Sequence, residues 1–259
     1  MFKKTKRHSA LDTDFWIDAF ARNQQNRPEP DWDAPLDIPD QVRPALTQSI
    51  LEFQLGDGGG PAGLIAFNRA SFQDETPEVR QVVDLWFDEE KEHSRLLGGM
   101  AERLEATPIE GHWSFSLFCF FRKWLGVDFE LQILTVTELV STSYYTLLRR
   151  HSDDPALNGV CALILRDESG HLRFQNDRLA SVGRHPGQWF WGAQFRLSAF
   201  IAGTVLWISH GRCIRGLGGS TREFYSDIHS QVEGFLQKLS VKKKKADLNV
   251  TENYVRQKT

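Results

Sequence analysis

Two short motifs in the sequence place a histidine three residues after a glutamate. Glu90 and His93 lie in "WFDEEKEHSRLL", and Glu168 and His171 lie in "LILRDESGHLRFQ". On a helix, residues three apart project from the same face, about one turn apart. A buried carboxylate and imidazole carry a large desolvation cost unless something pairs with them. A single motif of this kind is most simply a solvated polar patch, so the rest of the chain must show whether two of them have partners.

The segments that carry these motifs are predicted to be helices. Long stretches repeat their apolar residues every 3.6 positions and almost none alternates with period 2, so the fold class is all-α. Thr76 and Asp154 are predicted N-caps, the first followed by Pro77 at the first helical position. We expect six long helices, at about 44–72 with a possible kink at "GDGGGPAG", 77–105, 128–151, 155–181, 187–214 and 220–239.

The order of the four central helices predicts a bundle with one long crossover. Helices 44–72 and 77–105 would form one antiparallel hairpin and helices 128–151 and 155–181 a second, with 107–126 as the crossover. The domain prediction has three parts. Residues 1–42 form an irregular arm strapped across the bundle, apart from a short helix in "DTDFWIDAFARN". Residues 43–240 form one helical domain that includes two extra C-terminal helices, and 241–259 form a polar, disordered tail.

Lone carboxylates on the partner helices match the two motifs in height. Glu138, in the apolar segment "ILTVTELVSTSYY", lies 14 residues before Ser152, and Glu168 lies 13 residues after Pro155. With 1.5 Å of rise per residue, these two glutamates are level across their hairpin. In the first hairpin the mismatch with Glu90 is roughly 3 Å for Asp57 and roughly 10 Å for Glu52. Asp57 is therefore the preferred partner, and Glu52 stays open as the alternative.

Taken together, these residues have the composition of a site for two metal ions. Carboxylate oxygens suit hard ions such as iron or manganese, and each imidazole would complete one coordination sphere. Four carboxylates also neutralise two divalent cations, which compensates the buried charge. The predicted metal ligands are Asp57, Glu90, His93, Glu138, Glu168 and His171.

This set resembles that of the ferritin-like non-haem di-iron carboxylate superfamily, over roughly residues 44–182. The superfamily includes acyl-carrier-protein desaturases, arylamine N-oxygenases, ribonucleotide reductase small subunits and bacterioferritins. The segment "FQLGDG" looks like a first-helix motif of small bacterial ferritin-like proteins, which usually have Glu where this chain has Asp57. The resemblance implies a ferritin-like four-helix bundle that holds two iron ions, or manganese with iron, and uses dioxygen as co-substrate.

The resemblance also implies residues that orient the ligands. An acidic residue directly before a ligand glutamate often holds the histidine of the opposite motif in this superfamily. Asp167 is therefore expected to hold His93, and Glu89 to hold His171, because a ligand imidazole needs a partner on its other nitrogen. For Glu89, in the charged run "DEEKE", solvation is an equal alternative.

Four further residues are placed near the metals by helix spacing. Ser141 and Thr142 follow Glu138 by about one turn, where relatives carry a hydroxyl that assists proton delivery. The alternative for both hydroxyls is a hydrogen bond to a carbonyl of their own helix. Tyr145 and Trp86 would line the pocket or pass electrons, with simple core packing as the more common role of such aromatic residues.

Composition and cysteine usage bound the remaining possibilities. The net charge of −3 gives no case for nucleic-acid binding. The three cysteines form no pair at metal or redox spacing, so a reducing cytoplasm is the expected compartment. The basic start is followed by no apolar signal segment, and "FRLSAFIAGTVLWISHGR" is interpreted as a buried core helix too short to span a bilayer.

Three functions compete on this basis. The first is a di-iron oxidase or oxygenase that hydroxylates, desaturates or N-oxidises a small or apolar organic substrate. It would take electrons from a separate ferredoxin or reductase, and a homodimer is left open. The second is a ferroxidase or iron-storage protein, and the third is a helical interaction module without metal. The first is favoured because the chain adds an N-terminal arm and two C-terminal helices to the bundle, as substrate-acting relatives do.

Overall fold

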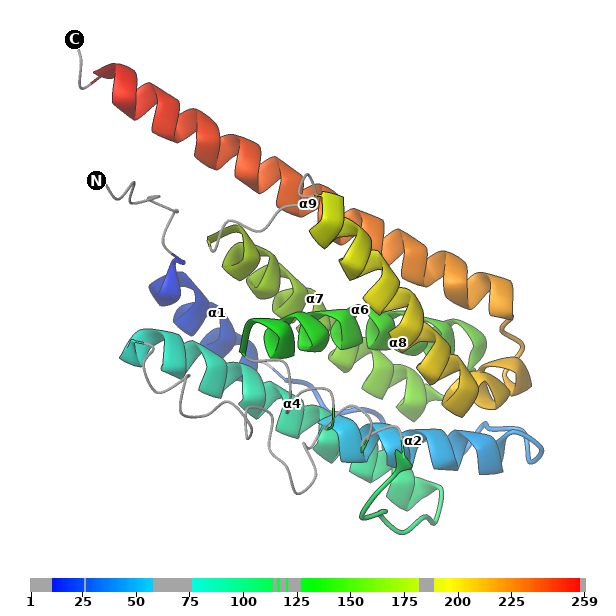
Figure 1. The fold of residues 1–259 in the computed structure, drawn as a ribbon. Coiled ribbons are helices and arrows are strands. Elements are labelled where there is room, and N and C mark those ends of the chain that lie inside the picture. Colours follow the sequence, from blue (N-terminus) through cyan, green and yellow to red (C-terminus); the bar gives the residue numbers. More distant parts are fainter. Residues whose placement is uncertain are drawn as a thin grey trace.

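The computed structural model describes residues 11–25, 27–57, 76–113, 116, 120, 127–181 and 189–256. Within these ranges the fold is all-helical, without a strand, as the sequence predicts (Figure 1). The long helices are α1 (Thr13–Gln25), α2 (Arg43–Asp57), α4 (Pro77–Arg103), α6 (Val127–His151), α7 (Pro155–Ser181), α8 (Trp189–Gly216) and α9 (Thr221–Arg256).

The central helices pack as two pairs, α2 with α4 and α6 with α7. The chain runs in opposite directions within each pair, and α4 packs on α7 to join the two (Figure 1). The predicted hairpins are therefore present as packed pairs. The predicted continuation of the first helix to residue 72 lies outside the described residues, as does most of the predicted crossover at 107–126.

Both predicted N-caps are confirmed. The Thr76 hydroxyl accepts a hydrogen bond from the Val79 amide at 3.4 Å, with Pro77 in the first turn of α4. Asp154 Oδ1 accepts one from the Leu157 amide at 2.8 Å at the start of α7. Each cap satisfies a backbone N–H that the helix itself cannot pair, which fixes where these helices begin.

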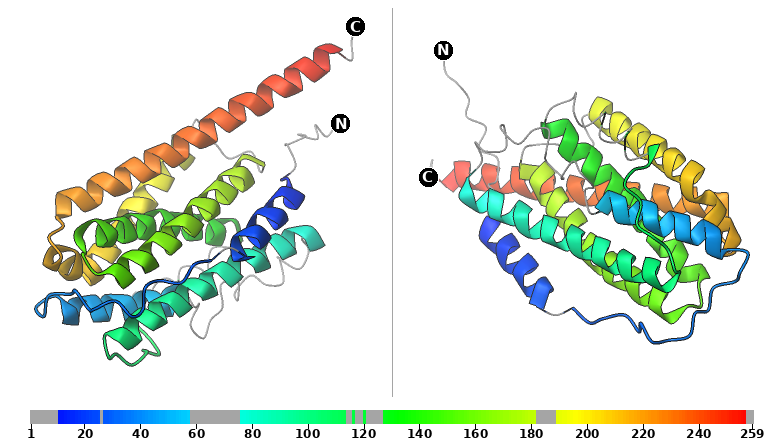
Figure 2. Two further views of the ribbon diagram at one scale, coloured as in Figure 1. Left: turned by 180° about the vertical axis from the view of Figure 1, so that it is seen from behind. Right: turned by 90° about the horizontal axis from the view of Figure 1, so that it is seen from below.

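The N-terminal arm consists of α1 and an extended strap over residues 27–42. Helix α1 packs on α4 and α7, and the strap then runs along the bundle toward α2 (Figure 2). The amide of Asp37 donates to Asp154 Oδ2 at 3.0 Å, and Arg103 Nη2 donates to the carbonyl of Ala34 at 3.0 Å. These bonds tie the strap to the ends of two core helices.

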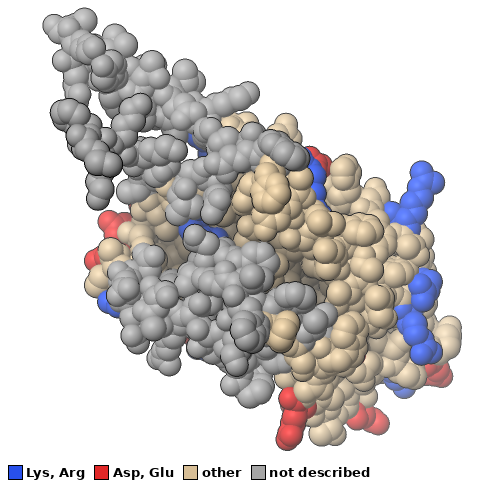
Figure 3. Space-filling model, viewed as in Figure 1, with Lys and Arg blue, Asp and Glu red and all other residues tan. Residues whose placement is uncertain are grey.

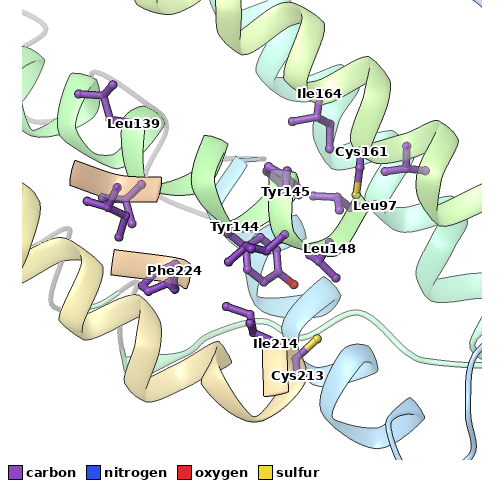
Figure 4. Packing of buried hydrophobic residues seen from close by; sticks show 14 of the residues in the cluster. Leu97, Leu139, Tyr144, Tyr145, Leu148, Cys161, Ile164, Cys213, Ile214 and Phe224 are labelled. Atoms are coloured by element: carbon purple, nitrogen blue, oxygen red, sulfur yellow. The ribbon is translucent and has the colours of Figure 1, made fainter. Parts of the chain in front are cut away.

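The main core lies where α6 meets α2, α7, α8 and α9. Figure 4 shows Tyr144 and Tyr145 of α6 between Cys161 and Ile164 of α7 and Cys213 and Ile214 of α8. These side chains are buried, and the two cysteines are free, so no disulfide contributes here. Cys119 lies outside the described residues.

Helix α8 is only partly a core helix. One face is buried through residues such as Phe195, while Phe190, Leu197, Ile201 and Ile208 are more than half exposed. Few charged side chains lie over this part of the surface in Figure 3. By length and composition alone, Phe190–Gly216 is long and apolar enough to cross a membrane. Within the protein, 33% of its most apolar window is buried. The interpretation of this segment as a buried core helix too short to span a bilayer is therefore corrected: α8 has 28 residues and an exposed apolar side.

Helix α9 also departs from the prediction. The sequence prediction ended it near residue 239 and left 241–259 as a disordered tail, whereas the helix continues to Arg256. No proline or glycine follows Gly234, so no strong helix breaker interrupts the segment. High polarity was mistaken for the absence of a helix.

Candidate metal centre

Five of the predicted ligands lie near the middle of helices α4, α6 and α7, where these helices pack together. Glu90 and His93 come from α4, Glu138 from α6, and Glu168 and His171 from α7. All five side chains are buried. We call these five residues, with Asp57 at the end of α2, the carboxylate–histidine cluster. One turn of helix separates the members of each Glu-x-x-His motif, so both members project into the same space.

Glu90 lies between the two imidazoles. His171 Nδ1 is 3.1 Å from Glu90 Oε1, and His93 Nδ1 is 3.5 Å from Glu90 Oε2. Glu168 is placed similarly, with its carboxylate oxygens 3.6 Å from His171 Nδ1 and 3.9 Å from His93 Nδ1. Two carboxylates therefore face both imidazoles, as ligands that bridge two ions must.

Two groups in this cluster have the geometry of a metal site. Glu90, Glu138 and His171 offer one ligand atom each within 4.8 Å of one another, and Glu90, His93 and Glu168 do the same. The two groups share Glu90. The described residues thus offer two neighbouring three-residue sites joined by one carboxylate.

The member of this cluster that comes from α2 is Asp57. Its Oδ2 accepts a hydrogen bond from the Tyr145 hydroxyl at 3.2 Å. Burial, and then the charge of Glu90, raise the pKa of Asp57 well above its usual value. Glu52, the alternative, faces elsewhere: its oxygens lie 3.1 Å from His112 Nε2 and 3.6 Å from His210 Nε2. Of the two first-helix candidates, Asp57 therefore lies with the other predicted ligands and Glu52 does not; metal binding by Asp57 stays a prediction.

Glu52 belongs instead to a second buried network, which we call the hydroxyl–histidine cluster: Ser49, Glu52, Tyr144 and His210, with His112 at its edge. Ser49 Oγ lies 2.7 Å from His210 Nδ1 and also bonds the Tyr144 hydroxyl. Gln48 Nε2 donates to Glu52 Oε1 at 2.6 Å. Burial lowers the pKa of His210 to about 3, so its imidazole is neutral.

Two outer carboxylates hold the imidazoles from behind. His93 Nε2 is 3.1 Å from Asp167 Oδ2, and His171 Nε2 is 2.9 Å from Glu89 Oε2. These are the pairings that the resemblance implied. Both carboxylates are buried, so the solvated alternative for Glu89 is wrong. Because a carboxylate accepts, each Nε2 carries the proton, and each Nδ1 is directed at the inner carboxylates.

Two residues of the arm, which the sequence reasoning missed, complete this outer layer. Asn23 Nδ2 donates to Glu89 Oε1 and to Asp167 Oδ1, both at 2.7 Å. Arg27 Nη2 lies 2.9 Å from Asp167 Oδ2 and 3.4 Å from Glu89 Oε1. A signal existed in the sequence for the first of them: Trp16, Phe20 and Asn23 follow the spacing of one helical stripe.

Aromatic residues enclose the His171 side of the cluster. Trp86 Nε1 donates to Glu90 Oε1 at 3.1 Å, and its ring lies edge-on to His171 at 5.9 Å. Phe20 lies 6.0 Å from the same imidazole, and Phe174 packs against both Trp86 and Phe20. Trp86 therefore contacts a predicted ligand directly, and the surrounding rings keep that side apolar.

The two hydroxyls expected near the metals bond to their own helix. Ser141 Oγ donates to the Glu138 carbonyl at 3.1 Å, and Thr142 Oγ1 donates to the same carbonyl at 2.7 Å. This is the alternative that the sequence left open. A role in proton delivery stays a prediction that these contacts do not support.

The electrostatics of the cluster reflect excess buried negative charge. Burial raises the pKa of Glu138 well above its usual value. Burial would lower the pKa of His93, but the neighbouring carboxylates of Asp167 and Glu90 outweigh it and raise this pKa to about 10. For Asp167 burial would raise the pKa, yet the bond to His93 lowers it to about 2. The buried carboxylates therefore favour the protonated, positively charged form of the neighbouring imidazole.

Unpaired buried atoms show that this charge is not satisfied by the protein alone. Both oxygens of Glu138, Glu168 Oε2, and Nδ1 of both His93 and His171 are buried without a hydrogen-bond partner. Buried polar atoms are normally paired, so several orphans at one place require an explanation. Oxygen and imidazole donors around a shared carboxylate could hold a metal ion.

Comparison with known proteins gives no match: no protein family, no curated protein and no solved structure is significantly similar to this chain.

Proposed function

We propose that this protein is a ferritin-like di-metal carboxylate protein whose centre holds two iron ions, or manganese with iron. The observation that carries the proposal is the set of orphaned oxygen and Nδ1 atoms that surrounds Glu90. The arrangement of α2, α4, α6 and α7 as two antiparallel pairs agrees with a ferritin-like bundle. Four inner carboxylates balance two divalent cations.

We further propose that the protein is an oxidoreductase that uses dioxygen to oxidise a small or apolar organic substrate. Two reduced iron ions at this position would supply the electrons and the open coordination positions that dioxygen activation requires. The arm, α8 and α9 extend the molecule well beyond the four central helices, which favours a substrate-acting enzyme over a storage protein. A cytoplasmic location and an external ferredoxin or reductase as electron donor belong to the same proposal.

The residues of the chain have separate tasks in this proposal. Glu90 and Glu168 face both imidazoles, and together with Glu138, Asp57, His93 and His171 they would hold the ions. Asp167 and Glu89 keep the proton on Nε2 of the imidazoles, so that Nδ1 is presented inward. Trp86 restrains one oxygen of Glu90 and, with Phe174, excludes water from the His171 side.

The experiment that tests this function follows the fate of iron and dioxygen together. Metal-free protein is loaded anaerobically with ferrous iron, separated from excess metal, and mixed with dioxygen while absorbance and dioxygen consumption are recorded. We expect about two iron ions per chain and a prompt optical change. Both should be lost in Glu138→Ala and kept in Glu52→Ala, the matched control in the other cluster.

Excess ferrous iron distinguishes the enzyme from the ferroxidase alternative. A substrate-oxidising enzyme consumes dioxygen in proportion to its own bound iron and then requires an added reductant. A ferroxidase continues to consume ferrous iron and accumulates ferric product beyond its two sites. Loading of no stoichiometric metal would contradict both functions and favour a helical module without metal.

A further inference from the structure

The N-terminal arm reaches the rear of the carboxylate–histidine cluster through Asn23 and Arg27. One amide nitrogen, Asn23 Nδ2, donates to both outer carboxylates at 2.7 Å. These carboxylates come from different helices, Glu89 from α4 and Asp167 from α7. A single NH₂ group with two hydrogens thus links the two halves of the bundle at the level of the imidazoles.

Arg27 supplies positive charge at the same point. Its guanidinium lies within ion-pair distance of both outer carboxylates, and its side chain is only 13% exposed. Two carboxylates that share one buried amide repel each other, and a buried charge without compensation is costly. Asp167 also contacts Arg166, at 3.2 Å, so the arm is one of two cationic contributions on that side.

The arm is held in place independently of these polar contacts. Trp16 and Phe20 of α1 are buried against Val82, Trp86 and Phe174. Asn23 lies one turn beyond Phe20 on the same stripe. The apolar anchor therefore fixes the height and direction from which Asn23 meets the outer carboxylates, and the replacement of Asn23 alone leaves this anchor intact.

We propose that Asn23 and Arg27 are positioning residues of the metal centre: they fix Glu89 and Asp167, which in turn aim Nδ1 of His171 and His93 at the metals. This inference rests on the proposed function, because it assigns the arm a task at that site. Its consequence is that a docked arm is required for tight binding of divalent metal, although no atom of the arm touches the metal.

The test uses the full chain, with Co²⁺ as a spectroscopic probe of the divalent sites. Asn23→Leu keeps the shape of the side chain and removes the bridging donor, and Arg27→Met removes the charge. Gln25→Leu, at an exposed position of the same helix, is the matched control, and Arg27→Lys tests rescue by charge. The readouts are Co²⁺ affinity, unfolding temperature, and the NMR signals of the imidazole Nε2–H protons in metal-free protein.

We expect Asn23→Leu to weaken Co²⁺ binding by about tenfold or more, the range seen when residues that support metal ligands are removed. The Nε2–H signals should broaden or vanish, because the outer carboxylates are no longer held. Arg27→Lys should retain more affinity than Arg27→Met, and Gln25→Leu should behave as wild type. If Arg27→Met fails to fold, Asn23→Leu decides alone.

Folded Asn23→Leu and Arg27→Met proteins with wild-type Co²⁺ affinity and unchanged Nε2–H signals would overturn the positioning role. A wild-type protein that binds no Co²⁺ would overturn the proposed function instead. In that case the NMR signals still decide the inference: their loss in Asn23→Leu supports the arm as the element that positions the imidazoles, and their persistence overturns it.

Discussion

Two buried polar clusters flank α2 and α6, and they differ in how their charge is balanced. In the hydroxyl–histidine cluster, one carboxylate faces two imidazoles and an amide, and Ser49 links His210 to Tyr144. In the carboxylate–histidine cluster, four inner carboxylates face two imidazoles whose other nitrogens are already committed. Among the described residues the first cluster leaves one orphaned atom, Glu52 Oε2, whereas the second leaves five orphaned oxygen and nitrogen atoms.

The pKa values of the histidines express the same difference. Burial lowers the pKa of His210 to about 3 because no neighbouring negative charge outweighs it. For His93, burial acts in the same direction, but the surrounding carboxylates raise the pKa to about 10. A buried imidazole that stays neutral is typical of a structural network. The raised pKa of His93 shows that the carboxylates around it favour positive charge at this place.

The largest expected effect separates metal binding from stability. Glu138→Gln should lower metal affinity by more than about 100-fold, because it removes a ligand and not only its support. The metal-free variant should unfold at the same temperature as wild type or higher, since burial already disfavours the charge of Glu138. Glu52→Gln should do the opposite and lower stability while metal affinity is unchanged. Calorimetric metal titration and thermal unfolding check both variants, and equal effects in the two would erase the distinction between the clusters.

A stability loss without a metal phenotype is expected at His210. His210→Leu removes a hydrogen-bond partner of the Ser49 hydroxyl and a partner of Glu52, and it leaves buried polar groups unpaired. A loss of about 1–3 kcal/mol in the free energy of unfolding should follow. Denaturant unfolding at pH 7 measures it, and a loss of metal binding in this variant would show that the second cluster also belongs to the site.

The pH dependence of stability sharpens the same point. The pKa of His210 is about 3 in the folded protein against 6.5 ordinarily. Below pH 6.5, His210 is therefore protonated in the unfolded chain but stays neutral in the folded protein. This contribution is complete above pH 6.5 and is lost as the pH falls toward 3, by about 2 kcal/mol at pH 5. The stability difference between wild type and His210→Leu should therefore narrow by about that amount from pH 7 to pH 5. If this stability difference were the same at pH 7 and pH 5, a group other than His210 would be responsible for the pH dependence.

The smallest expected effect compares two adjacent tyrosines. Tyr145 donates to Asp57 in one cluster, and Tyr144 bonds Ser49 in the other. Tyr145→Phe should reduce metal affinity severalfold, since one hydrogen bond contributes about 0.5–1.5 kcal/mol. Tyr144→Phe, the control, should lower stability by a similar amount without any change in affinity. Identical behaviour of the two variants would contradict the placement of Asp57 beside the metals.

The sequence predicted the core of the site because its signals are local. Each Glu-x-x-His motif needs only a helix, and the heights of Glu138 and Glu168 follow from distance to a turn with clear capping residues. The outer pairs of Asp167 with His93 and Glu89 with His171 came from the resemblance, and the structure has the same contacts.

The features that the sequence did not predict depend on tertiary contacts or on the absence of residues that end a helix. Asn23, in the last turn of α1, and Arg27, just after that helix, are ordinary polar residues, and only the docking of the arm brings them to the outer carboxylates. Nothing in the sequence says that the segment after residue 239 is helical except the absence of breakers. The exposed apolar side of α8 was missed because a run of apolar residues looks the same whether one face is buried or both are.

The most direct test of the central claim is anomalous X-ray diffraction at the iron edge from crystals of protein loaded with ferrous iron. We predict two anomalous peaks, one between Glu90, Glu138 and His171 and one between Glu90, His93 and Glu168. A crystal without peaks there, or with a single peak between Glu52 and His210, would contradict the assignment of the carboxylate–histidine cluster as a di-metal centre.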